Sequence, residues 1–217
     1  MAYDFLDRLS TPGVRAAQAA NGAGGLWDRA DGHRPLTHFT EREAAFIAAR
    51  DSFYLASVSQ SGWPYIQHRG GPPGFLAVLD ATTLGFADYR GNRQYISLGN
   101  VADDDRVALF LMDYPGRKRL KVLAHMTPFD LTADPDLAAR LGPAGYRAVP
   151  ERGFKLRLEA FDWNCPQHIT PRFTVPEVEE AVAPLRARLA SLEAETARLR
   201  DATGGAEDHS PGRSLSF

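Results

Sequence analysis

Short runs in which hydrophobic and polar residues alternate dominate the middle of the chain, between Ser52 and Met126. Their period of two, with many β-branched and aromatic residues, predicts strands. The predicted strands cover residues 52–59, 64–69, 75–80, 83–88, 106–113 and 118–126, and a returning strand covers 154–161. Tight turns between these runs favour an antiparallel meander, which only one long helical stretch, at about 92–101, interrupts.

Helical signals flank this region. Pro12 at a first helical position predicts a short helix over 13–20, and the capping box from Thr40 to Glu43 opens another that runs to about Arg50. The glycine-rich, polar residues 21–35 read as a loop, and 135–141 as a brief helix. We therefore expect an N-terminal helix and loop extension over 1–38 and a strand-rich domain over 39–173.

A long C-terminal helix is predicted over 174–201, followed by a disordered tail over 202–217. Apolar positions in this helix alternate four and three residues apart, which is the a/d spacing of a coiled coil. They are Val178, Val182, Leu185, Leu189, Leu192, Thr196 and Leu199. The spacing leaves two interpretations open: the helix packs on its own domain, or it pairs with a partner subunit.

Composition narrows the possible partners and surroundings. With 217 residues, 44% of them hydrophobic, the chain can bury one substantial core. Its 25 basic and 27 acidic residues are nearly balanced, which favours neither nucleic acid nor a membrane surface. The start lacks a signal-peptide pattern, no apolar run is long enough to span a membrane, and Cys165 is the only cysteine. A cytoplasmic protein without disulfides and without a metal site is expected.

One candidate ligand site follows the predicted strand 83–88. A glycine turn leads there into the predicted helix, with Asn92, Arg93 and Gln94 in its first turn. Free backbone amides and the positive end of the helix dipole favour an anion at that place, and Arg93 would complete a phosphate clamp. The plainer interpretation is an arginine that is merely solvated at a helix start.

A second candidate is the run Gln67-His68-Arg69-Gly70-Gly71, which ends one predicted strand. Glycines there allow the backbone to approach a flat ligand closely, and Arg69 could meet a second phosphate oxygen. An ordinary wide turn with a surface arginine explains the same residues, and this stretch alone does not separate the two interpretations.

Taken together and in this order, these segments resemble the pyridoxamine 5′-phosphate oxidase-like, FMN-binding split-barrel family, over about residues 39–126. The resemblance implies a mainly β fold with flanking helices: a six-stranded antiparallel split β-barrel of the FMN-binding type, here with a long C-terminal helix. It also implies a homodimer with FMN in a groove between the subunits. The cofactor-binding residues that it implies are His68, Arg69, Gly70, Gly71, Phe86, Ala87, Asp88, Asn92, Arg93 and Gln94.

Two departures from the family pattern affect what can be carried over. Where the vitamin-processing oxidases have a serine followed by an arginine-lysine pair, this chain has Asn92, Arg93 and Gln94, and so lacks one positive charge. Phosphate binding would then depend more on Arg69 or on Arg119. The C-terminal region also lacks the tryptophan and arginine pattern that completes a pyridoxine phosphate site. The chain is therefore not expected to be a true pyridoxamine phosphate oxidase.

A polar and aromatic cluster follows the last predicted strand. It contains Trp163, Asn164, Gln167 and His168, and it could form a substrate pocket beside the flavin in its own subunit or in the partner subunit. The alternative is a structural turn in which Trp163 fills core and His168 caps a backbone group.

The expected function is an FMN-dependent oxidoreductase that acts on an unidentified small molecule. The flavin would carry out the chemistry, so no catalytic side chain is assigned. A deazaflavin-dependent reductase on the same barrel is one alternative. Another is a non-catalytic flavin- or haem-binding carrier or sensor, with His68, His125 and His168 as candidate iron ligands, although lone histidines are more often structural.

Overall fold

The computed structural model describes residues 3–26, 37–142, 145–163 and 166–204. It divides into two compact units, Met1–Pro171 and Arg172–Phe217, which are described separately. The helices of the first unit are α1 (Tyr3–Leu9), α2 (Pro12–Ala20), α3 (Glu41–Ala48), α4 (Ile96–Asp103), the short 3₁₀ helix η1 (Leu131–Ala133) and α5 (Pro135–Leu141). The second unit contains α6 (Val175–Gly204).

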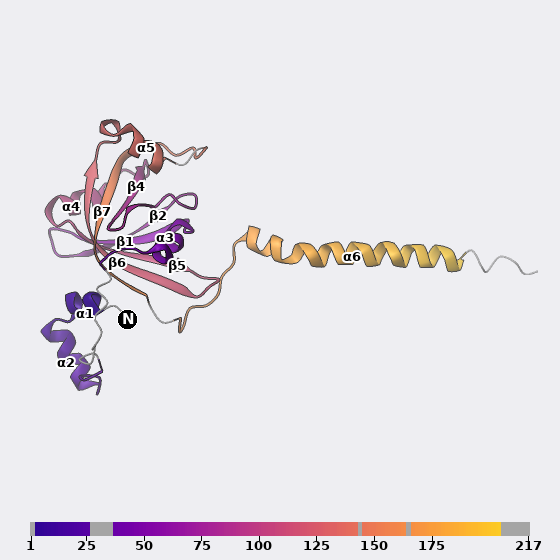
Figure 1. The fold of residues 1–217 in the computed structure, drawn as a ribbon, viewed down its shortest axis with the longest axis horizontal. Coiled ribbons are helices and arrows are strands. Elements are labelled where there is room, and N and C mark those ends of the chain that lie inside the picture. The colour runs from indigo at the N-terminus through magenta and orange to yellow at the C-terminus, as the bar shows by residue number, and fades with distance from the viewer. Residues whose placement is uncertain (1–2, 27–36, 143–144, 164–165, 205–217) are drawn as a thin grey trace, which may run out of the picture. The chain divides into compact units, whose positions relative to one another are not determined.

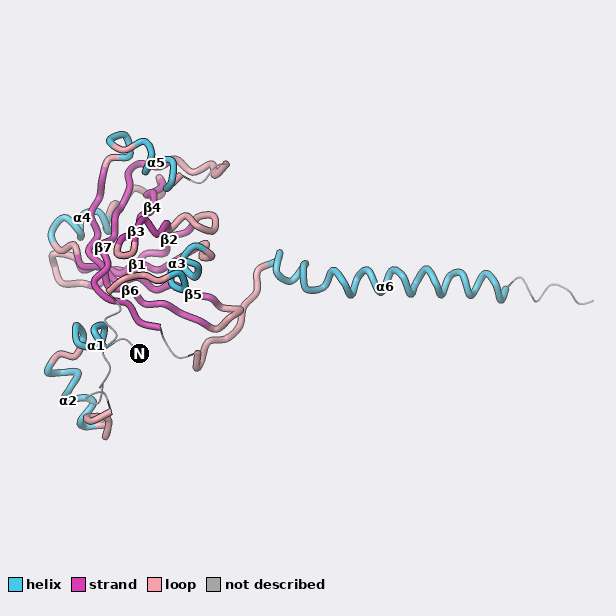
Figure 2. Tube along the Cα trace, in the orientation of Figure 1, coloured by secondary structure: helices cyan, strands magenta, loops and turns pink. Residues whose placement is uncertain are grey.

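All strands of the first unit belong to one antiparallel sheet (Figure 1). They are β1 (Ser52–Val58), β2 (Pro64–Gly70), β3 (Ala77–Asp80), β4 (Thr83–Tyr89), β5 (Arg106–Asp113), β6 (Lys118–Phe129) and β7 (Pro150–Trp163). Their order across the sheet is β2-β1-β5-β6-β7-β4-β3. Helices α4 and α5 lie at margins of the sheet, as Figure 2 shows, whereas α3 packs into the main core through Phe46 and Ile47.

The mainly β architecture with flanking helices and a C-terminal helix is confirmed, and all seven strands predicted from alternation are present. The six-stranded barrel implied by the family resemblance is not confirmed, because the described residues form seven strands, among them the short β3, which pairs with β4 as a hairpin in which Ala77 lies opposite Gly85. The sheet is also open: β2 and β3 are its two edges, and no backbone ladder joins them within the described residues.

Alternation along the strands builds the core. Inward residues of β1, β4 and β7 meet there: Phe53 stacks on Phe75 with ring centroids 5.6 Å apart and meets Phe86 edge-on at 5.4 Å. Phe86 in turn lies 5.3 Å from Phe154. Burying each of these rings contributes about 1.5 to 3 kcal/mol relative to leaving it exposed.

The helix predictions agree with the structure at α2, α3, α5 and α6, within a few residues at their ends. The predicted helix at 92–101 is displaced, since α4 runs from Ile96 to Asp103. Helix α1 was not predicted; Phe5 buries its ring against Ala160 of β7, so tertiary packing supports this short segment. Most of the predicted disordered tail, residues 205–217, lies outside the described residues.

Helix α3 is tied to the end of β7 by a carboxylate. Glu43 accepts a hydrogen bond from the Thr40 backbone amide at 3.1 Å and another from Nε1 of Trp163 at 2.7 Å. The Trp163 ring also packs edge-on against Phe46, with centroids 4.7 Å apart. Burial by itself raises the pKa of Glu43, but the hydrogen bonds from Thr40 and Trp163 outweigh it, and the pKa lies below its ordinary 4.5.

Replacing Trp163 by Phe is expected to lower the free energy of unfolding by about 1 to 3 kcal/mol, because the buried Glu43 carboxylate loses a donor. Denaturant unfolding measures this. Trp63→Phe is the matched control, since Trp63 is 76% exposed and should change stability by less than about 0.5 kcal/mol. The pKa of Glu43 is lower in the folded state than in the unfolded state. The contribution of Glu43 to the free energy of unfolding is therefore complete above its unfolded pKa, and it is lost as the pH falls through its folded pKa. Equal losses in both variants would contradict this role.

Candidate functional site

The loop between β4 and α4 has its own local structure. The Asn92 side-chain oxygen accepts a hydrogen bond from the backbone N–H of Gln94 at 3.1 Å. Arg93 and Tyr95 have positive φ angles of 61° and 52°, in the left-handed region. The expectation that Asn92, Arg93 and Gln94 form a first helical turn is therefore wrong, because a local side-chain bond holds this segment in a turn. Helix α4 begins only at Ile96.

Two buried polar contacts hold α4 against the sheet. Ser97 donates a hydrogen bond to the Gln67 side chain of β2 at 2.8 Å. Asn100 donates one to the Ser57 hydroxyl of β1 at 2.9 Å. Ser97 and Asn100 are both buried, so breaking either bond leaves a buried polar group without its partner. These contacts fix the position of the loop relative to β2.

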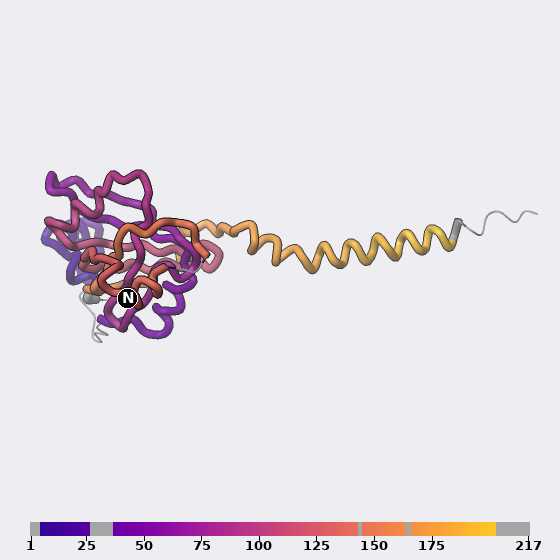
Figure 3. The backbone as a smooth tube through the Cα atoms, turned by 90° about the horizontal axis from the view of Figure 1, so that it is seen from above, coloured from indigo at the N-terminus to yellow at the C-terminus, as the bar shows by residue number. Residues whose placement is uncertain are grey.

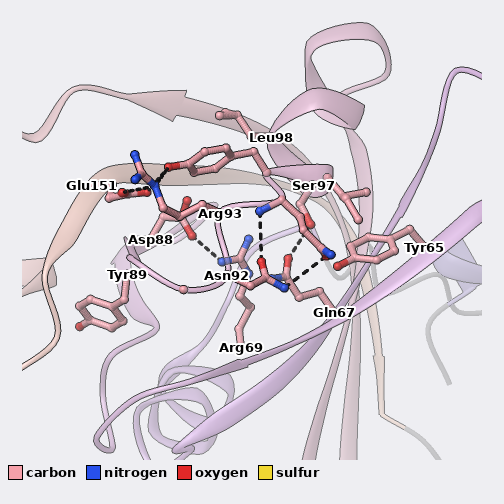
Figure 4. Close-up of a pocket in the computed structure, with 14 residues that line it drawn as sticks. Tyr65, Gln67, Arg69, Asp88, Tyr89, Asn92, Arg93, Ser97, Leu98 and Glu151 are labelled. Atoms are coloured by element: carbon pink, nitrogen blue, oxygen red, sulfur yellow. Dashed lines mark hydrogen bonds and ion pairs between the residues drawn. The ribbon is translucent and has the colours of Figure 1, made fainter.

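A cavity of about 210 Å³ lies between this loop, β2, β4 and the start of β7 (Figure 4). It brings together five of the predicted cofactor-binding residues, which are Arg69, Asp88, Asn92, Arg93 and Gln94. The remaining lining residues are Tyr65, Gln67, Tyr89, Gly91, Tyr95, Ile96, Ser97, Leu98 and Glu151.

Asp88 lies at the centre of a buried charge cluster. Its carboxylate forms an ion pair with Arg69 of β2 and accepts a hydrogen bond from Arg152 of β7 at 3.3 Å. The three side chains retain only 13%, 10% and 20% of their exposure for Arg69, Asp88 and Arg152. Arg69 also lies over the Phe86 ring, with its guanidinium carbon 5.5 Å from the centroid. One carboxylate therefore positions two guanidinium groups from two other strands.

Glu151 is the second carboxylate of the cavity. It accepts hydrogen bonds from the Tyr95 hydroxyl at 3.0 Å and from Nε of Arg90 at 3.1 Å. Nε of Arg93 donates to the same Tyr95 hydroxyl at 3.0 Å and lies 3.9 Å from a Glu151 oxygen. Burial raises the pKa of Glu151, but the bonds from Tyr95 and Arg90 and the charges of Arg90 and Arg93 outweigh it, so the pKa is lowered.

The connected cluster has an excess of positive charge. Its guanidinium groups belong to Arg69, Arg90, Arg93 and Arg152, and only two carboxylates, Asp88 and Glu151, face them. In addition, Nε of Arg69 is buried without a hydrogen-bond partner within the described residues. An excess of charge and an unsatisfied donor at one cavity suit an anionic group such as a phosphate.

Two predicted cofactor-binding residues lie on other faces of the sheet. His68 follows Gln67 and precedes Arg69 on β2, so its side chain points to the opposite side, where its ring meets Tyr54 at 5.7 Å. Arg119 lies on β6, opposite Met112 of β5, with its guanidinium 6.0 Å from the Phe110 ring. Neither side chain lines the cavity.

Four more of the predicted cofactor-binding residues lie in the core or at the end of a strand. Phe86 is part of the main core, and Ala87 packs under α5 against Leu137 and Leu141. A side chain at Gly71 would meet the Phe75 ring at 2.6 Å, so this glycine makes room for core packing. Gly70 is exposed at the end of β2. None of these four residues lines the cavity.

The described residues of the cluster at the end of β7, Trp163, Gln167 and His168, do not line the cavity. Trp163 is engaged with Glu43 and α3, as described above. Gln167 and His168 are exposed, and His168 has a positive φ of 61°. Asn164 lies outside the described residues. A role of this cluster in a substrate pocket therefore stays a prediction.

Three residues of the charge cluster, Tyr95, Glu151 and Arg152, are not among those predicted from the sequence. Tyr95 could have been predicted from the sequence, because it directly follows Asn92-Arg93-Gln94 and carries a hydroxyl that can bond to nearby side chains. Glu151 and Arg152 open β7, and nothing in their local pattern separates them from other charged residues at a strand start. Only the pairing of β4 with β7 sets Arg152 opposite Asp88 and brings Glu151 to the cavity.

Neither a metal-binding group nor a membrane-spanning helix is found in the described residues. Within the described residues, no three His, Cys, Asp or Glu side chains gather as a metal-binding group. His125, a candidate iron ligand, has Nδ1 at 2.7 Å from an Asp105 oxygen and Nε2 at 3.8 Å from a Glu159 oxygen. In the same part of the chain, no helix combines the length and the apolar character needed to cross a bilayer.

Residues 39–158 match the family model described as pyridoxamine 5′-phosphate oxidase. No curated protein matches the sequence. Among solved structures, an FMN-binding protein from Syntrophomonas wolfei is similar, with 12% identity, 69% of this chain and 97% of that chain covered, and a TM-score of 0.47.

Two further solved structures are similar. One is a protein from Lactobacillus delbrueckii titled a possible pyridoxamine 5′-phosphate oxidase, with 23% identity, coverage of 58% and 94%, and a TM-score of 0.43. The other is titled an F420 reductase, with 19% identity, coverage of 57% and 98%, and a TM-score of 0.42. At these identities and TM-scores, the likeness carries no information about ligand or activity.

Replacing Asp88 by Asn is expected to lower the free energy of unfolding by about 2 to 4 kcal/mol, because Arg69 and Arg152 lose their shared buried counter-charge. Inorganic phosphate should restore part of this loss by binding the same arginines. Thermal or denaturant unfolding with and without phosphate measures both effects. Asp104→Asn is the control, since its ion pair with the exposed Arg106 should contribute little to stability. A stable Asp88→Asn variant that ignores phosphate would contradict this role.

Proposed function

The chain belongs to the pyridoxamine 5′-phosphate oxidase family, and on that premise we propose that it binds FMN and works as an FMN-dependent oxidoreductase on a small molecule. The observation that supports this proposal most directly is the arginine-rich cavity beside the β4–α4 loop. FMN ends in a phosphate monoester, which carries close to two negative charges at neutral pH. The charge excess of the cluster is of the size that this group needs.

Three residues would hold the phosphate. Arg93 is 64% exposed at the mouth of the cavity, so its guanidinium can turn from Tyr95 to the ligand at little cost. Arg69 also lines the cavity and brings a second positive charge to it. Gln94 contributes an uncharged amide where the vitamin-processing oxidases carry a lysine. The positive charge that binds the phosphate would therefore come from the planar guanidinium groups of arginines.

The cavity holds only part of the cofactor. Its volume of about 210 Å³ is below the range of about 300 to 1,000 Å³ that is usual for complete small-molecule sites. The phosphate and the adjoining chain would occupy it, and the flavin ring would extend beyond it. A second subunit would then cover the ring.

An exposed apolar face supports a homodimer. On the side of β1 and β2 away from the cavity lie Tyr54, Val58 and Ile66, with Ile66 67% exposed. Exposed apolar side chains that adjoin one another in a sheet commonly mark a protein interface. His68 lies on the same face, opposite Tyr54. If this face forms the subunit interface, the His68 side chain would be placed to contact the cofactor of the partner subunit.

When bound, the flavin would supply hydride or electron transfer. The residues of this chain bind and orient it, exclude water around the phosphate, and keep a positive field near it. Pyridoxamine phosphate is not the proposed substrate, because Gln94 replaces a lysine and the C-terminal pattern of the vitamin-processing oxidases is missing. The substrate class proposed is therefore a small molecule other than vitamin B6.

Mass spectrometry of the small molecule released from protein purified without added ligand tests the cofactor. Release of FMN supports the proposal. Release of a deazaflavin would support a deazaflavin-dependent reductase instead, and release of haem would support a haem-binding carrier or sensor. Protein that releases nothing and fails to quench the fluorescence of added FMN would overturn flavin binding altogether. Reduction of the bound flavin by NADH or NADPH, followed by reoxidation with candidate substrates, then separates an enzyme from a carrier.

Arg93→Ala is expected to weaken FMN binding by about ten- to a hundredfold, because a charge-assisted contact with the phosphate is lost. Quenching of FMN fluorescence in a titration gives the affinity. Arg157→Ala is the matched control, since Arg157 is an exposed arginine of β7 that does not line the cavity. The proposal predicts a much smaller loss of riboflavin affinity, as riboflavin has no phosphate. An equal loss for both ligands would remove Arg93 from the phosphate site.

Glu151→Gln is expected to change FMN affinity in the opposite direction. The carboxylate competes with phosphate for Arg90 and Arg93, and glutamine keeps an acceptor for Tyr95 without the charge. Binding should become about three- to tenfold tighter, with riboflavin affinity unchanged. The same fluorescence titration measures this effect. Weaker FMN binding in Glu151→Gln would show that the carboxylate orients the arginines more than it competes with the ligand.

A further inference from the structure

Helix α6 carries a mostly apolar stripe in which every residue except the half-buried Val182 is exposed. Leu185, Leu189 and Leu199 are 70%, 57% and 61% exposed. The stripe consists of Val178, Val182, Leu185, Leu189, Leu192, Thr196 and Leu199, which alternate four and three residues apart along the 30-residue helix. An exposed seam with this spacing is a surface for packing against another helix.

The residues of the seam favour a parallel pair of helices. In heptad notation, Val182, Leu189 and Thr196 occupy the a positions, and the d positions over the same stretch are leucine: Leu185, Leu192 and Leu199. β-Branched residues at a, combined with leucine at d, favour two-stranded parallel coiled coils. Two of the three a positions, Val182 and Thr196, are β-branched.

The charges beside the seam are complementary to a second copy of the same helix. In a parallel pair in register, a g position faces the next e position of the other helix. Arg188 at g then faces Glu193 at e, and Glu195 at g faces Arg200 at e, on both sides of the pair. An antiparallel pair would also bring opposite charges together. The charges therefore indicate that the partner is a second copy of the helix, and the residues at a and d indicate that the two helices are parallel.

Pro184 is compatible with such a pair. It stands at a c position, on the side away from the seam, and the helix continues through it (Figure 3). A proline inside a helix costs about 3 kcal/mol, and helices exposed to water draw most of their stability from packing. Helix α6 therefore needs a packing partner more than a regular helix of its length would.

We propose that α6 forms a parallel, in-register, two-stranded coiled coil with α6 of a second copy of this chain, over about residues 182–199. The coiled coil joins two copies independently of whether the first unit binds a flavin. It thus adds a second interface to the homodimer proposed above.

Cysteine cross-linking in the full-length chain tests the pairing. Leu192→Cys places a thiol at a d position, where the two helices face each other, and Ala194→Cys places it at f, on the opposite side. Both variants are made with Cys165→Ser. In a glutathione redox buffer, Leu192→Cys should form a disulfide-linked dimer at least about tenfold faster than Ala194→Cys, because only facing cysteines meet the distance limits of a disulfide. A dimer held together through the first unit would bring the two cysteines together equally well in both variants. Equal rates of disulfide formation in Leu192→Cys and Ala194→Cys would therefore overturn the proposal.

A charge exchange tests the orientation. In the Leu192→Cys background, Arg188→Glu and Glu193→Arg each set like charges opposite each other in a parallel pair, so each alone should cross-link more slowly. An equal mixture of the two variants should recover the rate as a mixed dimer. In that dimer the introduced glutamate of one helix faces the introduced arginine of the other, and the unchanged Arg188 faces the unchanged Glu193. A mixture that stays slow would overturn the parallel arrangement.

The cross-linking rate of Leu192→Cys should be the same when Arg93→Ala is added. The two proposals can then fail separately: loss of flavin binding leaves the cross-link intact, and loss of the cross-link leaves flavin binding intact. A rate that falls with Arg93→Ala would show that α6 pairing depends on the cofactor, contrary to the inference.

Discussion

The ion pair between Arg69 and Asp88 is the contact on which the site depends. It joins β2, an edge of the sheet, to β4, which is separated from β2 in hydrogen-bonded order by β1, β5, β6 and β7. Backbone ladders do not span that gap within the described residues, so a buried pair of charges does. Because Asp88 also binds Arg152, the same carboxylate sets the positions of two guanidinium groups around the cavity. Such a pair adds little net stability, but it is costly to break.

The sequence was informative wherever structure is local. Alternation and turn residues predicted every strand, but β6 continues past the predicted end to Phe129, and β7 extends beyond the predicted 154–161 at both ends, to Pro150 and Trp163. Capping and proline signals predicted α2 and α3. It failed where a side chain competes with the backbone: the Asn92 bond to Gln94 delays the start of α4 to Ile96. It also grouped His68 with Arg69 because they are adjacent, although neighbours in a strand face opposite sides. Glu151 and Arg152 lay beyond reach, since only strand pairing brings them to Asp88.

The charge cluster explains why the cavity can be both stable and receptive. Each carboxylate pairs with arginines that would otherwise repel one another, and the remaining positive charge would favour the binding of an anion. Tyr95 links Arg93 to Glu151 through its hydroxyl, so the arginine nearest the solvent has a partner within the cluster. Arg69 and Arg152 are positioned by Asp88, and side chains that are already fixed would lower the entropic cost of binding an anion.

The open sheet leaves two strand edges whose backbone groups could recruit strands of other molecules, which is a common route to aggregation. Both edges have features that oppose it. Strand β3 is only four residues long and has an irregular register between Val78 and Asp80. Strand β2 begins with Pro64, which has no backbone N–H to offer, and carries a guanidinium group close to its other end. The sheet can thus stay open at β2 and β3 without presenting a long, regular template for fibril growth.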